Sequence, residues 1–276
     1  MDAAGKLAID MKYINPLAVS IKLDNKSKFQ MYAENKPLPV PTAVINRFGV
    51  RGYAFGYLVG HYCKACAIPL INPFDSVIYG KNKFISLNIA RELGIEIPVT
   101  FFPAYASDLS AHIAGKVRPP FIVKIQTGTQ GIGVMLARDA GTMQAISDYL
   151  WDKNEIFIIQ HFIDKSERLY DVRLLFFDNE FLGAFSKVSR KDEFRANFHR
   201  GGNVSGYDPE RALIDQSLQL MKKTGLRFAG IDYIIKKDKS PVFLEINESP
   251  GFEAFENIHG RFVAERVLEM LANSLG

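Results

Sequence analysis

Two hydrophobic periods alternate along the chain and predict a mixture of strands and helices. Short apolar runs, or runs in which apolar and polar residues alternate, predict strands at residues 17–23, 42–46, 68–72, 95–102, 155–163, 170–177, 181–186, 228–236 and 241–247. Runs in which apolar residues recur every three to four positions predict helices at residues 58–67, 83–93, 143–153, 209–223 and 260–273. Residues 120–138 are expected to form a strand, a glycine-rich loop and a second strand. The mixture predicts an α/β (α+β) chain.

Several helix ends are marked by residues that favour such positions. Gly94 follows the run 83–93 and is expected to end that helix in a left-handed conformation. Asp208 and Pro209 form a favourable helix start, and Gly225 is expected to end the same helix. The helix at 143–153 is expected to face the core with Ile146, Tyr149 and Leu150.

The last predicted strand carries polar side chains within an apolar run. Alternation places Val242, Leu244 and Ile246 on one face, and Phe243, Glu245 and Asn247 on the other. A carboxylate and an amide at the end of an apolar strand offer the hard oxygen ligands that suit Mg2+.

A second carboxylate is expected to face this pair from the neighbouring strand. If residues 236 and 241 pair across the intervening turn, Asp232 lies opposite Glu245 in an antiparallel register. Two facing carboxylates repel each other unless a cation lies between them. The alternative is a structural hairpin whose acids face solvent, and the apolar neighbours of Asp232 weaken that alternative.

Three lysines stand where a lone cation is unfavourable. Lys124 lies in an apolar run, and a buried ammonium needs a partner such as a phosphate. Lys81 and Lys83 lie at the start of a predicted helix, where the helix dipole disfavours cations. One of these two is expected to reach for phosphate; an exposed lysine pair is the alternative.

Three glycines follow Lys124 in the loop of the 120–138 block. Gly128, Gly131 and Gly133 leave the backbone free to bring N–H groups close to phosphate oxygens. Their spacing matches neither the P-loop nor the dinucleotide-binding fingerprint, and no helix follows directly. A flexible turn without a ligand is compatible with the same pattern.

A row of hydrogen-bond donors is predicted in residues 194–202. In an extended segment Arg195, Asn197 and His199 lie on one face, opposite three apolar side chains, and Arg200 and two glycines follow. Such a row suits an anionic ligand such as a triphosphate or a carboxylate. A cationic loop in solvent is the alternative.

Composition limits the class of protein. The chain has 276 residues, of which 47% are hydrophobic, enough for a sizeable core in one large or two modest domains. The net charge of +4 suits small anionic ligands and does not favour a nucleic-acid surface.

We expect a cytoplasmic protein without a membrane span, since no apolar run reaches about 18 residues and no signal peptide is recognised. Cys63 and Cys66 are expected to be free, reduced thiols on a partly buried helix.

The motifs together resemble the ATP-grasp superfamily, most closely its RimK-type branch of ATP-dependent ligases that add glutamate to a protein tail. They are KIQTGTQGIGV (124–134), YDVR (170–173), FRANFHRGG (194–202), AGID (229–232) and LEINESPGFE (244–253). Their order and spacing also fit, and the similarity covers nearly the whole chain from about Ile14 on.

The resemblance implies an ATP-grasp fold in which ATP is held between two α+β subdomains. It implies a small N-terminal α/β pre-ATP-grasp domain at residues 1–80, a central subdomain with the glycine-rich loop at 81–163, and a C-terminal subdomain with the metal site at 164–276. The first domain is expected to lack its first strand and helix, since residues 8–16 already resemble the second strand.

The resemblance also implies roles for individual residues. ATP would be bound by Lys83, Lys124, Gly128, Gly131, Gly133, Gln160, His161, Phe162, Asp171, Arg195 and Asn197. Two Mg2+ ions, with Mn2+ as an alternative, would be held by Asp232, Glu245 and Asn247. The catalytic residues would be Arg195, Asn197 and Arg200, and the substrates would meet at Arg200, Gly201, Gly202, Ser249 and Gly251. His161 departs from the family pattern, in which an acidic residue is usual at this place in the adenine hinge.

The implied activity is amide formation through an acyl-phosphate. Glutamate is the expected amine, a peptide or small carboxylate the expected acceptor, and a homo-oligomer the expected assembly. Two alternatives stay open: a RimK-like ligase that uses another amino acid or a metabolite acceptor, and a non-catalytic ATP-binding regulatory module.

Overall fold

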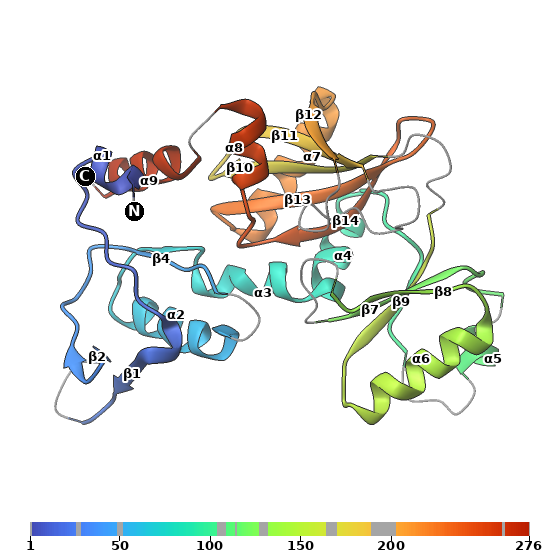
Figure 1. Cartoon of the computed structure of the whole chain (residues 1–276), viewed down its shortest axis with the longest axis horizontal. Coiled ribbons are helices and arrows are strands. Elements are labelled where there is room, and N and C mark those ends of the chain that lie inside the picture. Colours follow the sequence, from blue (N-terminus) through green and yellow to red (C-terminus); the bar gives the residue numbers. More distant parts are fainter. Residues whose placement is uncertain are drawn as a thin grey trace.

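The structure is a computed structural model that describes residues 2–25, 29–48, 52–103, 109–113, 115–126, 132–163, 170–188, 203–260 and 263–275. Figure 1 shows three regions: an N-terminal region, a central sheet with helices on one face, and a larger sheet near the C-terminus. None of the helices in these ranges combines the length and the hydropathy of a membrane-spanning segment.

The N-terminal region is built from short elements. Its helices are α1 (Asp2–Lys6), a 3-10 turn (Pro16–Ala18) and α2 (Tyr53–Ala65); its strands are β1 (Val19–Lys22), β2 (Gln30–Ala33), β3 (Lys36–Pro37), β4 (Val44–Ile45) and β5 (Leu70–Ile71). The first three strands form an antiparallel sheet, and β4 and β5 form a parallel pair. Residues 9–15 form no strand, so the interpretation of residues 8–16 as a second strand is wrong.

The central sheet has the strand order β6-β9-β7-β8. Its elements are β6 (Thr100–Phe101), α5 (Leu109–Ile113), β7 (Phe121–Ile125), β8 (Val134–Ala137), α6 (Ala140–Asp152) and β9 (Phe157–His161). The strand predicted at 155–163 is observed as β9, which lies inside the sheet between β6 and β7. One face packs against α5 and α6 through Phe121, Val123 and Ile159. Lys124 pairs with Ile158 on the opposite face, and Ile158 belongs to the core of the larger sheet. Lys124 therefore faces that sheet.

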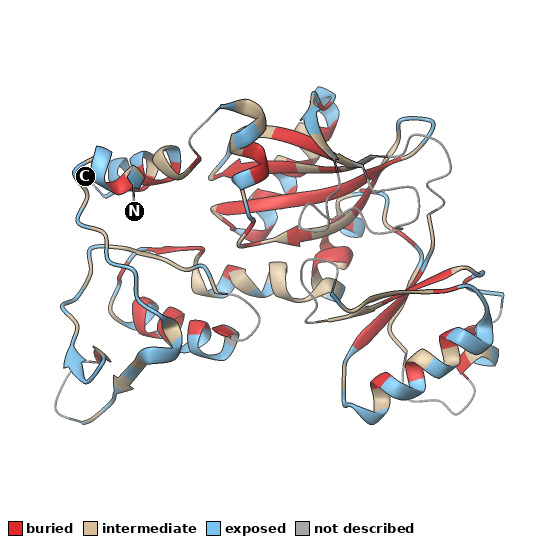
Figure 2. Ribbon diagram, viewed as in Figure 1, coloured by how far each residue is buried: buried red, intermediate tan, exposed pale blue. Residues whose placement is uncertain are grey.

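The larger sheet is antiparallel throughout, with the order β12-β11-β10-β13-β14. Its strands are β10 (Tyr170–Phe177), β11 (Glu180–Val188), β12 (Asn203–Tyr207), β13 (Phe228–Ile235) and β14 (Pro241–Asn247). The helices α3 (Val77–Lys81), α4 (Lys83–Glu92), α7 (Arg211–Thr224), α8 (Glu253–His259) and α9 (Val263–Asn273) complete this part of the chain. Figure 2 shows long buried stretches along its inner strands.

The two faces of the larger sheet differ in chemistry. Val172, Leu174 and Phe176 of β10 point to the face covered by α4 and α7, where they join the largest hydrophobic core. Alternation sends Asp171 and Arg173 to the other face. The far end of that second face is closed by a second core around Phe177 and Phe255, which includes residues of α8 and α9.

The predicted pairing of Asp232 with Glu245 is confirmed, by a different route from the one expected. Ile235, rather than residue 236, pairs with Pro241, and a register shift between Asp232 and Tyr233 then brings Asp232 opposite Glu245. Such a bulge interrupts strict alternation. Phe243 therefore joins Ile246 in the main core instead of sharing the face of Glu245, as alternation predicted.

Glycines end the predicted helices as expected. Gly94, after α4, and Gly225, after α7, have φ of 73° and 66°, the left-handed region that glycine adopts without steric cost. The predicted start of α7 is wrong, because the helix begins after Glu210 and has no side-chain cap. Tyr149 was also assigned wrongly to the core, since its side chain lies on the exposed face of α6.

Candidate functional site

The centre of the site is a charged pair on the polar face of the larger sheet. Arg173 on β10 and Asp232 on β13 are direct cross-strand neighbours. The Arg173 guanidinium donates from Nε to Oδ1 at 2.6 Å and from a terminal nitrogen to Oδ2 at 2.5 Å. Both side chains are about one-eighth exposed, at 13% and 12%. Burial raises the pKa of Asp232, but the charges of Arg173 and Lys187 outweigh it and hold that pKa below its ordinary value.

Lys187 is a second cation on this face that the sequence analysis missed. Its Nζ lies 4.0 Å from Asp232 Oδ1, and its side chain is only 13% exposed. Burial lowers the pKa of Lys187, and the positive charge of Arg173 lowers it further. Asp171 pairs with Lys187 across β10 and β11 and partly offsets that effect. The sequence offered one signal for this residue: Lys187 is charged and directly follows the apolar strand predicted at 181–186.

Lys83 connects the two sheets at the edge of the site. Its ammonium group donates to the carbonyl oxygen of Gln126 at 3.3 Å, at the end of β7, just before the glycine-rich segment. It also lies 3.8 Å from Glu245 Oε2 on β14. Lys83 is mostly buried, at 13% exposed, whereas the Glu245 side chain is 39% exposed. Of the two lysines considered in the sequence, Lys83 therefore faces the candidate metal residues, and Lys81 pairs with Glu248.

Lys124 reaches the same region from the central sheet. Its charge is close enough to Asp232 to lower the pKa of that carboxyl. Gly133, which follows the loop, has φ of 76°. A Cβ at this position would lie 2.3 Å from Ile125 Cγ1, so a side chain is excluded there whether or not the loop binds phosphate.

The turn after β14 is fixed by hydrogen bonds. Asn247 Oδ1 accepts the Ser249 N–H at 3.1 Å, and a terminal nitrogen of Arg47 donates to the Pro250 carbonyl at 2.9 Å. Gly251 completes the turn, and its Cβ position is open. Ser249 and Gly251 therefore lie directly beyond the candidate metal residues.

The predicted adenine hinge lies at the end of β9. The Gln160 side chain is buried and donates to Thr100 Oγ1 at 2.9 Å. The backbone N–H groups of His161 and Phe162 donate to the Val99 and Pro120 carbonyls at 3.0 and 3.1 Å. These three donors already have protein partners, so the hinge role gains no support from them. Asp171, predicted to hold the ribose, lies beside Lys187.

Seven predicted site residues lie outside the described ranges and stay predictions: Gly128, Gly131, Arg195, Asn197, Arg200, Gly201 and Gly202.

The residues present fit a hard cation. Asp232, Glu245 and Asn247 offer two carboxylates and one amide, and oxygen donors of these types are the ligands of Mg2+. Within the described ranges no three His, Cys, Asp or Glu side chains gather as a metal site, so the amide is needed to complete the set. Both Asp232 oxygens are engaged by Arg173, and a bound ion would share or replace that contact.

Comparison with known proteins places the chain in a family. A family model described as the RimK-like ATP-grasp domain matches residues 80–271. A probable alpha-L-glutamate ligase of Pectobacterium carotovorum is 30% identical over 276 residues, covering 98% of this chain and 88% of the relative. A probable alpha-L-glutamate ligase of Shewanella pealeana is 28% identical over all of this chain, which spans only 60% of the length of that relative.

A solved structure supports the fold independently. The ATP-grasp ligase associated with a ribosomally synthesised peptide in Chryseobacterium gregarium, solved with ADP and a leader and core peptide, superposes with a TM-score of 0.73. It is 14% identical, and the match covers 99% of this chain and 91% of the other. The ATP-grasp fold expected from the sequence is therefore confirmed. The family model and the relative from Pectobacterium carotovorum show that this protein belongs to the RimK-like ATP-grasp family.

Proposed function

We propose that the protein is an ATP-dependent carboxylate–amine ligase that forms an amide through an acyl-phosphate. The observation that carries the proposal is the position of Lys83, between the Gln126 carbonyl near the glycine-rich segment and Glu245 in the candidate metal set. A cation at this point neutralises charge on one side of a phosphate chain, while a metal ion binds its other side.

ATP and Mg2+ are the proposed ligands of this site. Lys83 and Lys124 would bind phosphate oxygens, and Asp232, Glu245 and Asn247 would hold two Mg2+ ions. Mg2+ supplies positive charge against the phosphate oxygens. Lys187 and Arg173 add fixed positive charges on the same face, which act without reorganisation when charge develops on the reacting phosphoryl group.

The proposed reaction has two steps. A carboxylate oxygen of the acceptor attacks the γ-phosphorus of ATP, the bond to the β–γ bridging oxygen breaks, and ADP leaves. The amine then attacks the acyl carbon, the carbon–oxygen bond to phosphate breaks, and the nitrogen loses a proton to give the amide. The chain positions and neutralises these groups, with Arg195, Asn197 and Arg200 proposed as catalytic contacts.

Glutamate is the proposed amine, and a peptide or a small carboxylate the proposed acceptor. The names of the relatives support glutamate, and the peptide bound to the Chryseobacterium gregarium ligase supports a peptide acceptor. The division at residues 80 and 163, a homo-oligomeric state and a cytoplasmic location are further proposals.

The test is ADP release from Mg-ATP with glutamate and then with each other amino acid, with and without peptides from a cell extract. Glutamate-dependent ADP release together with a product heavier by one glutamyl unit supports the proposal. ATP binding without ADP release under every condition supports the alternative, a regulatory nucleotide-binding module.

A further inference from the structure

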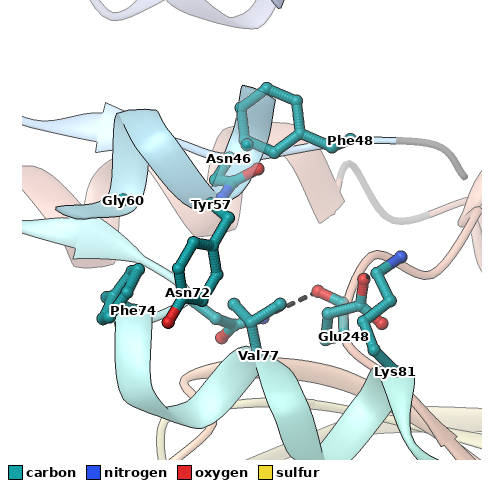
Figure 3. A pocket seen from close by; sticks show the side chains of 10 residues that line it. Asn46, Phe48, Tyr57, Gly60, Asn72, Phe74, Val77, Lys81 and Glu248 are labelled. Atoms are coloured by element: carbon teal, nitrogen blue, oxygen red, sulfur yellow. Dashed lines mark hydrogen bonds and ion pairs between the residues drawn. The ribbon is translucent and has the colours of Figure 1, made fainter. Parts of the chain in front are cut away.

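A small cavity separates the N-terminal region from the end of β14 (Figure 3). Tyr57 and Phe74 line one side, and Lys81 and Glu248 line another. Its volume is about 20 Å³, enough for about one water molecule. The cavity is too small for an amino acid, so Lys81 and Glu248 at its edge do not form a substrate site there.

Lys81 and Glu248 form a mostly buried ion pair. Lys81 Nζ lies 2.6 Å from Glu248 Oε1, and the side chains are 21% and 8% exposed. The neighbouring Gly80 makes this approach possible, because a Cβ there would lie 2.7 Å from Glu248 Oε2. The end of α3 therefore packs closely against Glu248, because Lys81 forms an ion pair with it and Gly80 has no side chain in the way.

The backbone around Glu248 is held from the same side. Asn72 Nδ2 donates to the carbonyl oxygens of Glu248 and Phe228, both at 2.7 Å, and the first of these bonds is drawn in Figure 3. Arg47 donates to the Pro250 carbonyl and lies 5.1 Å from the centre of the Phe252 ring. The residues before α4 therefore fix the chain from Glu248 to Pro250.

We call the contacts that Lys81, Asn72 and Arg47 make with residues 248–250 the clamp on Glu248. It begins one residue beyond Asn247. We propose that Lys81 and Glu248 form a positioning pair, which fixes the turn after β14 and so sets the orientation of the Asn247 amide toward the metal site. The proposal rests on the proposed function, since it assigns the pair a role in Mg2+ binding. The partners that orient a metal ligand, without touching the metal, commonly determine its affinity.

The test measures binding of a fluorescent ADP analogue while Mg2+ is titrated. Glu248→Gln is expected to raise the Mg2+ concentration for half-saturation about tenfold, and to change nucleotide affinity at saturating Mg2+ by less than about twofold. Lys81→Met is expected to shift the Mg2+ midpoint in the same direction. It lowers the melting temperature more than Glu248→Gln, because Glu248 is the more buried partner.

The double variant separates positioning from stability. Lys81→Met with Glu248→Gln removes both charges, so the melting temperature is expected to recover relative to Lys81→Met while the Mg2+ midpoint stays shifted. The control is Asp75→Asn, which breaks the exposed Lys64–Asp75 pair next to α3, with side chains 55% and 69% exposed. It is expected to leave both quantities unchanged.

Two results overturn the proposal while leaving the proposed function intact. In one, the variants lose stability but keep the wild-type Mg2+ midpoint, so that the pair is only structural. In the other, Glu248→Gln raises KM for the amino acid and leaves the Mg2+ midpoint unchanged, so that Glu248 contacts substrate. Wild-type protein without any Mg2+-dependent nucleotide binding would remove both the proposed function and this inference.

Discussion

Asp232 and Glu245 face each other in the candidate metal set, yet their loss should affect the fold very differently. Asp232→Asn leaves Arg173 and Lys187 as two nearby cations, each with a side chain only 13% exposed. Glu245→Gln removes the negative charge of a side chain that is 39% exposed and whose Oε2 lies 3.8 Å from Lys83 Nζ. The first change breaks a buried pair and the second a weak, half-exposed one.

The expected magnitudes follow from that difference. Removing one partner of a buried ion pair costs about 3–5 kcal/mol of unfolding free energy, because the remaining charge stays buried without compensation. A solvent-accessible pair contributes about 0–1 kcal/mol. Asp232→Asn is therefore expected to destabilise the protein by about 3–5 kcal/mol, and Glu245→Gln by less than about 1 kcal/mol.

The assay is urea unfolding followed by circular dichroism at several pH values. The pKa of Asp232 is lowered in the folded state, so its contribution to stability is present above the unfolded carboxyl pKa of about 3.9 and is lost as the pH falls through the folded value. The difference between wild type and Asp232→Asn should be full at pH 7 and narrow only below about pH 4.

The matched control is the double variant Arg173→Met with Asp232→Asn. It removes one of the two buried cations that Asp232→Asn leaves without a partner, with Lys187 still in place, and is expected to recover part of the lost stability. Equal stability of Asp232→Asn and Glu245→Gln at pH 7, or a difference between wild type and Asp232→Asn that grows on acidification, would refute the reasoning.

Three further predictions concern single side chains. Glu245→Gln should lower Mg2+-dependent turnover by at least about a hundredfold, since it removes one negative charge from the proposed metal set while keeping the fold; undiminished turnover in steady-state assays would remove the assignment. Lys124→Ala should weaken ATP binding by about tenfold or more in calorimetry, because it deletes a cation facing the Asp232 region; unchanged affinity would show that Lys124 serves another purpose. Burial raises the pKa of the Cys63 thiol to about 11, so Cys63 should resist iodoacetamide at pH 8 and become reactive only as the pH approaches 11; rapid labelling of Cys63 at pH 8, located by peptide mapping, would contradict that burial.

The sequence predicted those parts of the site that depend on short-range pattern. The short connection between β13 and β14 makes the two strands antiparallel neighbours, as predicted, although a register shift is needed to bring Asp232 opposite Glu245. Gly94 and Gly225 end their helices with left-handed backbones. Each of these features is decided within a few residues, where turn chemistry and glycine conformation dominate.

Other features depend on partners that are distant in sequence. The Arg173–Asp232 pair requires β10 to lie beside β13, and no local pattern specifies that neighbour. The bulge that moves Phe243 into the core reflects packing of the whole sheet. The clamp on Glu248 comes from Asn72 and Lys81, more than 160 residues earlier in the chain.

Local signals also failed where tertiary packing decided between two outcomes. Asp208 and Pro209 favour a helix start, yet α7 begins after Glu210. The seven-residue α8 was missed, because a helix of this length shows too little periodicity. It is stabilised here by burial of its own Phe255 side chain.

The central claim is that amide formation is coupled to the conversion of ATP to ADP. It is tested most directly by the ratio of ADP to amide product. The protein would be incubated with Mg-ATP, isotopically labelled glutamate and peptide acceptors, and ADP and labelled amide product would be counted in the same sample. We predict one ADP for each glutamyl unit transferred, and neither product from Glu245→Gln. ADP formed without any amide, or labelled amide formed without ADP, would contradict the account.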